Sequence, residues 1–270
     1  MLIATFAFAW MNLMAKYLQG FHPIQVVFFR AIGTFVFIFP FMLYKKIPII
    51  GSHVAWLSLR GLLSFLSLAL FFKVVQDIPL GSAVALRYTA PIFSVILAFF
   101  LLKEHVKFWQ WMCLLLAVVG AFIMKGVDVR IDTYSFIFIM LSALLVGAVF
   151  VIVRYLGDKE NHLTIINYFM VFSIIGSLLF IHKWRMPVGI EWLWISLIGT
   201  LGLIGQVFLT KALQMAEATI IAPLKYMELV YALLFGFVLF GEAYGLWPIV
   251  GMALVVCGIF FNILIKHKTN

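Results

Sequence analysis

Charged side chains stand inside stretches of this chain that are otherwise apolar. Arg30, Arg60, Arg87 and Lys225 each interrupt such a stretch, and Glu228 follows Lys225 by three positions. Residues three apart share one face of a helix, so Lys225 and Glu228 could form an ion pair. The positive charge left over in this set favours a ligand that carries a carboxylate or a phosphate. The predicted chemistry is therefore electrostatic binding, and we expect no catalytic residues.

Tyrosine and proline accompany the central charges. Tyr88 directly follows Arg87, and Tyr226 directly follows Lys225. Pro91 lies three residues after Tyr88, and Pro223 lies three residues before Tyr226. A proline inside a helix removes a hydrogen bond and frees a backbone carbonyl. In a membrane such carbonyls need a neighbouring helix or a cavity, and interrupted helices of this kind mark transport sites. We therefore expect helix breaks at both prolines and substrate contacts at both tyrosines.

Neutral polar residues and two further arginines complete the candidate site. Asn12, Tyr168 and Gln206 could form hydrogen bonds with a ligand, but each could equally bond a neighbouring helix. Arg30 and Arg60 lie near the ends of their apolar stretches, where they could instead reach polar surroundings or backbone carbonyls. The structural alternative for the central charges is a buried ion cluster that only holds two helices together.

The composition places these residues in a membrane. Of the 270 residues, 66% are hydrophobic and 11% are charged, and the mean hydropathy is +1.17. Soluble domains are about half apolar, whereas crossing a bilayer takes roughly 20 apolar helical residues. The long continuous apolar runs predict an all-α membrane protein with ten transmembrane helices. The expected helices cover residues 1–19, 24–44, 54–74, 80–102, 107–124, 134–154, 163–182, 191–213, 219–240 and 246–265.

The second half of the chain repeats the first at a constant offset of 138 positions. Pairs related by this offset are Lys16 and Arg154, Trp56 and Trp194, Lys73 and Lys211, Arg87 and Lys225, Tyr88 and Tyr226, Glu104 and Glu242, and Gly120 and Gly258. Each half holds an odd number of expected crossings, so the second half must be inverted in the bilayer. Inverted halves can expose one central site to either side in turn. We expect two five-helix repeats, at residues 1–126 and 127–270.

The distribution of basic residues predicts the orientation. If both termini are cytoplasmic, more of the lysines and arginines near span ends face the cytoplasm than face outside, as the positive-inside rule requires. The basic residues on the outer side would be Lys16, Lys73, Lys125, Arg130, Lys183 and Arg185. We therefore expect both termini in the cytoplasm, in an integral protein of a bacterial inner membrane. The net charge of +9 follows from loop lysines and arginines, and we expect no nucleic acid partner.

The sequence lacks the residue patterns that an enzyme would need. All six histidines fall in loops or at expected span ends, and Cys113 and Cys257 lie in apolar runs as packing residues. No two acids are spaced to share a site within a span, and no glycine-rich phosphate loop is present. We expect a protein that is not an enzyme and that holds no cofactor and no metal.

The fourth and ninth stretches carry a recognisable signature. The segments ALRYTAPIFSVILAFFLLKE, ending at Glu104, and APLKYMELVYALLFGFVLFGE, ending at Glu242, resemble the paired signatures of the EamA family in the drug/metabolite transporter superfamily. The resemblance covers the whole chain and implies a ten-helix inverted-repeat transporter. It also implies a central cavity lined mainly by the first, third, fourth, sixth, eighth and ninth helices. Arg87 and Lys225 are not a general feature of that family, so their role depends on the physical argument.

The sequence predicts a secondary transporter for a small anionic or zwitterionic metabolite, such as an amino acid or an organic acid. Members of the family move amino acids and related metabolites, nucleotide-linked compounds or drugs. A multidrug or nucleotide-type exporter of the same fold is therefore an open alternative, and a lipid-handling membrane protein is another. The expected partners are the small-molecule substrate and the lipid bilayer. The direction of transport, proton coupling and a homodimer are left open.

Overall fold

The chain is α-helical throughout the part that the structure describes. This computed structural model describes residues 1–101, 108–215, 224 and 226–267, and no strand occurs within them. The α-helices are α1 (Leu2–Tyr17), α2 (Pro23–Tyr44), α3 (Val54–Asp77), α4 (Leu80–Arg87), α5 (Ala90–Leu101), α6 (Phe108–Val127), α7 (Thr133–Leu156), α8 (His162–Leu178), α9 (Glu191–Met215), α11 (Met227–Phe240) and α12 (Leu246–His267). Short 3₁₀ turns occupy Gly157–Lys159 and Ile181–Lys183.

Several of the described apolar segments have the length that crossing a bilayer requires. Helical segments long and apolar enough to cross a membrane are Pro23–Tyr44, Val54–Asp77, Leu80–Leu101, Phe108–Val127, Thr133–Leu156 and Glu191–Leu209. Shorter apolar helices cover His162–Leu178, Met227–Phe240 and Leu246–Phe261. The described helices follow the order of the expected spans. Of the ninth expected span, at 219–240, the structure describes only residue 224 and residues 226–240.

Local sequence signals set several helix ends. The Asp132 carboxylate caps α7 by accepting hydrogen bonds from the backbone N–H groups of Tyr134 and Ser135. Asn161 caps α8 in the same way, because side-chain oxygens satisfy N–H groups that a helix leaves unpaired at its start. The C-terminal end of α11 is set by Gly241, whose φ of 62° lies in the left-handed region. A glycine adopts that conformation without strain.

The fourth expected span is divided into two helices. α4 ends at Arg87, a turn covers Tyr88 and Thr89, and α5 begins at Ala90, directly before Pro91. The Thr89 hydroxyl donates a hydrogen bond of 2.7 Å to the Leu86 carbonyl, which stabilises this turn. The interruption places Arg87 in the last turn of one helix, where the partial negative charge of the helix end favours a cation.

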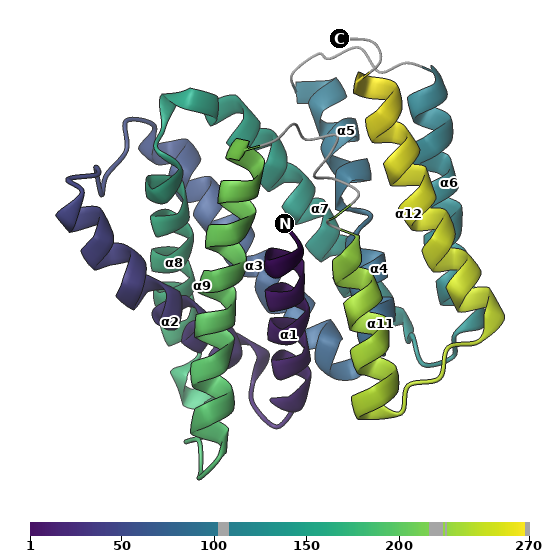
Figure 1. Ribbon diagram of the computed structural model, residues 1–270, viewed down its shortest axis with the longest axis horizontal. Helices are drawn as coiled ribbons and strands as arrows, with labels where there is room; N and C mark the ends of the chain where they lie inside the picture. The colour runs from purple at the N-terminus through teal and green to yellow at the C-terminus, as the bar shows by residue number, and fades with distance from the viewer. Residues whose placement is uncertain (102–107, 216–223, 225, 268–270) are drawn as a thin grey trace.

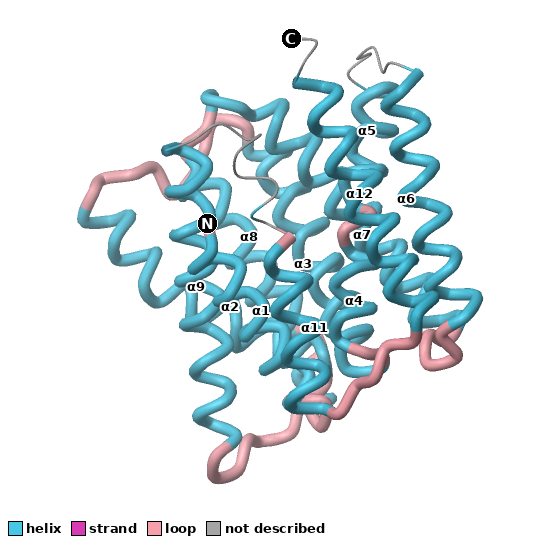
Figure 2. Tube along the Cα trace, turned by 45° about the vertical axis from the view of Figure 1, so that its right-hand side comes forward, coloured by secondary structure: helices cyan, strands magenta, loops and turns pink. Residues whose placement is uncertain are grey.

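The helices pack as a bundle of neighbouring pairs. α6 packs along α12, α1 packs against α9 and α11, and α3 packs against α7 and α8. α6 and α12 lie side by side at one edge of the bundle in both Figure 1 and Figure 2. α2 packs against α8 and α9, while α4 packs against α11 and α7. The arrangement brings α1, α4 and α11 together near the middle of the molecule.

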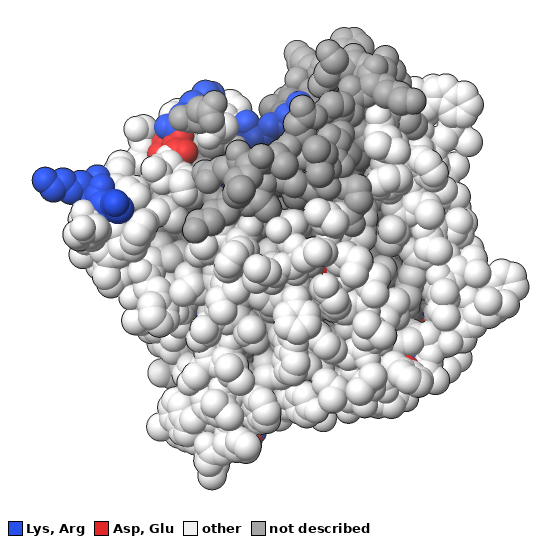
Figure 3. All heavy atoms as spheres, viewed as in Figure 1, with Lys and Arg blue, Asp and Glu red and all other residues white. Residues whose placement is uncertain are grey.

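The surface of the bundle is apolar where lipid would cover it. Large hydrophobic side chains such as Phe100, Phe122 and Phe237 are more than half exposed. The face drawn in Figure 3 carries almost no charge across its width, and lysine and arginine gather near its upper edge. A soluble protein rarely exposes a contiguous apolar surface of this extent. The described helices therefore belong to an integral membrane protein.

Candidate functional site

A cavity of about 230 Å³ is lined by residues of α3, α4, α5, α7, α11 and α12 and of the turns beside them. Its polar lining comes from Arg87, Tyr88, Tyr226 and Glu228. Its apolar lining consists of Phe71, Val84, Ala90, Pro91, Val146, Phe150 and Ile259. A concave, mostly apolar space with a few converging polar groups is the usual form of a small-molecule site.

The Glu228 carboxylate is held by two side chains from the first half of the chain. Asn12 Nδ2 on α1 donates a hydrogen bond of 3.0 Å to Oε1, and the Tyr88 hydroxyl donates one of 3.2 Å to Oε2. Glu228 lies in the first turn of α11, where the positive end of the helix dipole favours an anion. The Tyr88 and Tyr226 rings pack edge to face with centroids 5.3 Å apart. These contacts fix the carboxylate against the cavity.

Among the described lining residues, Arg87 is the cation. Its guanidinium carbon lies 3.9 Å from the centre of the Phe71 ring, and its charge interacts with that of Glu228. An aromatic face holds a guanidinium in a defined plane while leaving its edge N–H groups free to bind a partner. The described part of the lining therefore presents an anchored cation and an anchored anion at the same cavity.

A second group of arginines surrounds a single aromatic ring. Arg30 and Arg60 both lie with their guanidinium carbons 5.3 Å from the centre of the Phe169 ring. Arg30 is 6% exposed and interacts electrostatically with both Arg60 and Arg87. Arg30 Nη1 and Arg60 Nε are buried without a hydrogen-bond acceptor among the described residues. Arg30 therefore lies close to two other cations inside the helix bundle.

The structure brings some of the predicted site residues together and separates others. Asn12, Tyr88, Tyr226 and Glu228 meet at the cavity with Arg87. Arg30 and Arg60 gather instead around Phe169. Tyr168 packs beside the apolar cluster Leu57, Ile152, Leu156 and Ile165, and Gln206 is partly buried on α9; neither lines this cavity. Lys225 and Pro223 fall outside the described residues.

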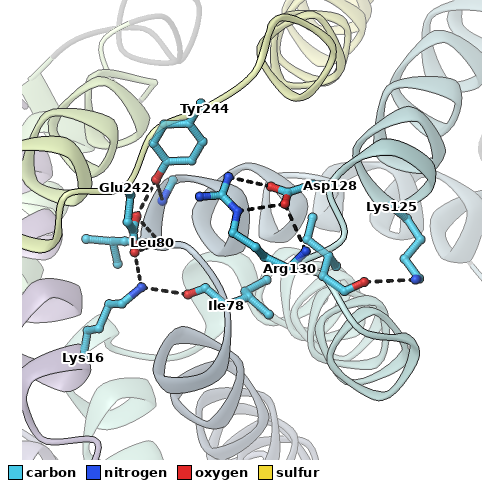
Figure 4. Close-up of polar contacts among 10 residues, drawn as sticks. Lys16, Ile78, Leu80, Lys125, Asp128, Arg130, Glu242 and Tyr244 are labelled. Atoms are coloured by element: carbon cyan, nitrogen blue, oxygen red, sulfur yellow. Dashed lines mark hydrogen bonds and ion pairs between the residues drawn. The ribbon is translucent and has the colours of Figure 1, made fainter.

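Sequence reasoning missed several residues. Phe71 and Phe169 look like ordinary lipid-facing bulk in the sequence, yet both hold arginines. Lys16 was expected among the basic residues on the outer side, but it is buried and pairs with Glu242 (Figure 4). The internal repeat offered a signal for this pair. Lys16 corresponds to Arg154 and Glu242 to Glu104 at the offset of 138 positions, so both positions are charged in both halves.

The described residues contain no group of three or more histidine, cysteine or acidic side chains that could hold a metal ion. The described lining offers a guanidinium, a carboxylate and two phenol groups, and the Asn12 amide bonds the carboxylate. Such groups bind and orient a charged small molecule, and no nucleophile paired with a general base accompanies them among the lining residues.

Comparisons with known proteins agree with this picture. The EamA-like transporter family matches the chain over residues 1–125 and again over residues 133–264. Solute carrier family 35 member G1 of Mus musculus is 29% identical over 94% of this chain and 74% of its own length. The pseudopaline exporter CntI of Pseudomonas aeruginosa strain PAO1 is 30% identical over 94% of this chain and 91% of its own. The S-adenosylmethionine uptake transporter of Rickettsia prowazekii is 25% identical over 96% and 89%.

A solved crystal structure has the same fold. It superposes with a TM-score of 0.65 over 100% of this chain and 97% of that chain, at 17% sequence identity. The matched family and the named relatives are transporters and not enzymes, which confirms both expectations from the sequence. Transporters of this kind work on a small-molecule substrate in a membrane. This chain belongs to the EamA-like transporter family.

Proposed function

We propose that this protein is a secondary transporter that moves a small anionic or zwitterionic metabolite by alternating access. The observation that carries the proposal is the imbalance of buried charge. Arg30, Arg60 and Arg87 interact with one another or with the single carboxylate of Glu228. Among the described residues, no carboxylate forms an ion pair with Arg30 or Arg60.

The energetics favour a ligand with negative charge. An ionisable group at membrane depth costs at least about 2.5–3.5 kcal/mol on insertion scales, and repulsion between neighbouring cations adds to that cost. A carboxylate or phosphate bound beside Arg87 would offset part of it through charge-assisted hydrogen bonds. An amino group on the same ligand could approach Glu228, which explains why a zwitterion also fits. A lipophilic cation would meet like charge instead.

The arrangement of helices supports two inverted repeats, at residues 1–126 and 127–270. Exchanging each helix for its counterpart at the offset of 138 positions turns the α1–α9 contact into α7–α3, and the α2–α9 contact into α8–α3. All of these contacts are present. Counterparts also pack on each other, as α2 on α8 and α6 on α12. Contacts that survive this exchange are expected of two halves that can swap roles around a central site.

Named relatives support small-molecule transport without fixing the substrate. The relatives in Pseudomonas aeruginosa and Rickettsia prowazekii are named for export of pseudopaline and for uptake of S-adenosylmethionine. The two relatives therefore move their solutes in opposite directions. Bacterial relatives support an inner-membrane location. The distribution of basic residues near span ends supports the proposal that both termini are cytoplasmic.

Uptake by proteoliposomes tests the proposed substrate class. Purified protein would be offered radiolabelled amino acids, dicarboxylic acids, phosphorylated metabolites and lipophilic cations in parallel. We expect uptake of at least one anionic or zwitterionic solute, competed by others of its class. Uptake of lipophilic cations alone would contradict the proposal and favour a multidrug exporter.

Cysteine labelling tests the proposed orientation. In a background lacking Cys113 and Cys257, Lys45→Cys and Lys183→Cys would each be labelled from one side of the membrane with an impermeant maleimide. We expect labelling from opposite sides, with position 45 facing the cytoplasm. Labelling of both positions from the same side would contradict the inverted ten-helix arrangement.

A further inference from the structure

A second buried charged cluster ties three helices together at one end of the bundle. Lys16, in the last turn of α1, forms an ion pair with Glu242, which follows α11 (Figure 4). The two side chains are 11% and 8% exposed. Lys16 Nζ also donates a hydrogen bond of 2.9 Å to the Ile78 carbonyl, just before α4. The cluster therefore joins the first half of the chain to the second.

Glu242 accepts hydrogen bonds on both of its oxygens. The backbone N–H of Leu80, at the start of α4, lies 2.9 Å from Oε2 and 3.2 Å from Oε1. The Tyr244 hydroxyl donates to Oε2 at 2.6 Å and accepts from the Gly81 N–H at 3.0 Å. Burial and the hydrogen bond to Glu242 hold the pKa of Tyr244 well above its usual value, so this hydroxyl stays protonated. We call Lys16, Glu242 and Tyr244 the end cluster.

Glycines let the tyrosine come close. A methyl group added at Gly81 would lie 2.9 Å from the Tyr244 hydroxyl, and one added at Gly236 would lie 2.8 Å from it. The far side of the Tyr244 ring faces Arg130, 5.5 Å from its centre, and Arg130 is itself held by Asp128 at 2.9 Å (Figure 4). The two glycines and Arg130 therefore all pack around the Tyr244 side chain.

The end cluster and the cavity share the same helices. On α1, Asn12 bonds Glu228 while Lys16, one turn later on the same face, bonds Glu242. On α4, Leu80 meets the end cluster and Arg87 meets the cavity, seven residues or about 10 Å apart along the helix. Between these two levels, the α4 residues Ala83 and Leu86 are fully buried against neighbouring helices. A movement of α11 relative to α1 and α4 would therefore change both sets of contacts.

We propose that the end cluster is the lock that closes one end of the cavity, and that it opens and re-forms in each transport cycle. This inference rests on the proposed function, because a lock has a role only where a central site changes sides. The ion pair and its hydrogen bonds hold α11 against α1 and α4. When they separate, the end of α11 can move away and connect the cavity with solvent at that side. Under the proposed orientation this side is the outer one.

A reporter cysteine tests the lock without any transported solute. Ser82 lies on α4 just beyond the end cluster, is fully buried and has no hydrogen-bond partner for its hydroxyl among the described residues. Ser82→Cys would be placed in the full chain after Cys113→Ser and Cys257→Ser, in sealed membrane vesicles. The measured quantity is the rate of labelling by a membrane-impermeant maleimide added from the side of the end cluster.

We expect the double variant Lys16→Ala/Glu242→Gln to raise this rate at least about 10-fold, because removing the contact favours the open state. The matched control is Lys73→Ala/Asp77→Asn, which removes an exposed ion pair of 2.5 Å that lies within α3 alone. It should leave the rate unchanged. Unchanged labelling in the end-cluster variant, or an equal rise in the control, would overturn the proposal.

A milder variant keeps the test decisive if the double variant does not accumulate. Tyr244→Phe retains both charges and removes only the hydroxyl contacts to Glu242 and Gly81. We expect a smaller rise in labelling, about 3-fold, in folded protein. An unchanged labelling rate in Tyr244→Phe would overturn the proposal that the end cluster is a lock. Because the assay uses no solute, a wrong substrate class and a wrong lock give different results.

Discussion

Glu228 at the start of α11 and Glu242 just after its end are both held by hydrogen bonds, but Glu228 borders the cavity, whereas Glu242 is not among its described lining residues. Glu242 has an ion-pair partner, a backbone donor and a phenol donor, all within a closed cluster. Glu228 is held by an amide and a phenol beside a cavity, with Arg87 across from it. One anion is enclosed by protein groups, whereas the other borders space that a ligand can enter.

This difference separates two uses of buried charge. A closed, fully bonded cluster fixes the relative position of helices, and breaking it leaves a buried charge without a partner. The Arg87 and Glu228 pair borders a cavity, and the positive charges of Arg30 and Arg60 add unfavourable energy that an incoming anion can relieve. α1, α4 and α11 contribute contacts at the cavity and at the end cluster. A ligand that stabilises the charges at the cavity can therefore also change the contacts of the end cluster. The predictions below test this division.

The largest effect is expected when one half of the ion pair is removed. Lys16→Ala leaves Glu242 buried without its cation, and we expect a loss of roughly 3 kcal/mol in stability, the lower part of the range for broken buried pairs. Adding Glu242→Gln should restore part of this loss, because no unpaired charge remains. Thermal unfolding of the purified protein in detergent measures both. If the double variant is less stable than the single one, the pair is not the source of the effect.

Removing the cavity cation should stop transport without unfolding the protein. Arg87→Ala removes a charge-assisted contact with the ligand worth about 1.5–3 kcal/mol, which corresponds to roughly 10- to 100-fold in uptake at low solute concentration. The protein should still accumulate in the membrane. Lys73→Ala, an exposed cation outside the cavity, serves as the control. Undiminished uptake in Arg87→Ala would place the binding site elsewhere.

A moderate loss of stability is expected at the tyrosine of the end cluster. Tyr244→Phe removes the donor to Glu242 and the acceptor for the Gly81 N–H, which leaves one buried backbone group unpaired. We expect a cost of about 1–2 kcal/mol, seen as a lower unfolding temperature. An unchanged unfolding temperature would show that the hydroxyl adds nothing to this end of the bundle.

The smallest effect tests how Arg87 is held. Arg87→Lys keeps the charge but loses the planar contact with Phe71 and the forked donors. We expect uptake to fall by only a few-fold, on the order of the 0.5–1 kcal/mol that such a stacked contact contributes. A loss as complete as in Arg87→Ala would mean that geometry, and not charge, decides binding.

The helical membrane architecture could be predicted because it depends on local properties. Continuous apolar runs fix where helices lie, and the family resemblance in the fourth and ninth spans is confirmed by the match over both halves. The approach of Asn12 to Glu228 could not be predicted, because it depends on how α1 packs against α11. The same holds for Lys16, since a lysine at a span end is also suited to a loop. Phe169 was overlooked because an aromatic residue among many carries no signal of its own.

The most direct test compares the two carboxylates in one measurement. The half-saturation concentration of uptake would be determined for wild-type protein, Glu228→Gln and Glu242→Gln, with the solute that the wild-type protein takes up best. We predict a change of about 10-fold or more for Glu228→Gln, because it removes a charge from the cavity. For Glu242→Gln we predict a half-saturation concentration within about 3-fold of wild type, with a lower unfolding temperature. Equal changes in half-saturation for both variants, or a change confined to Glu242→Gln, would contradict the assignment of Glu228 to the binding site.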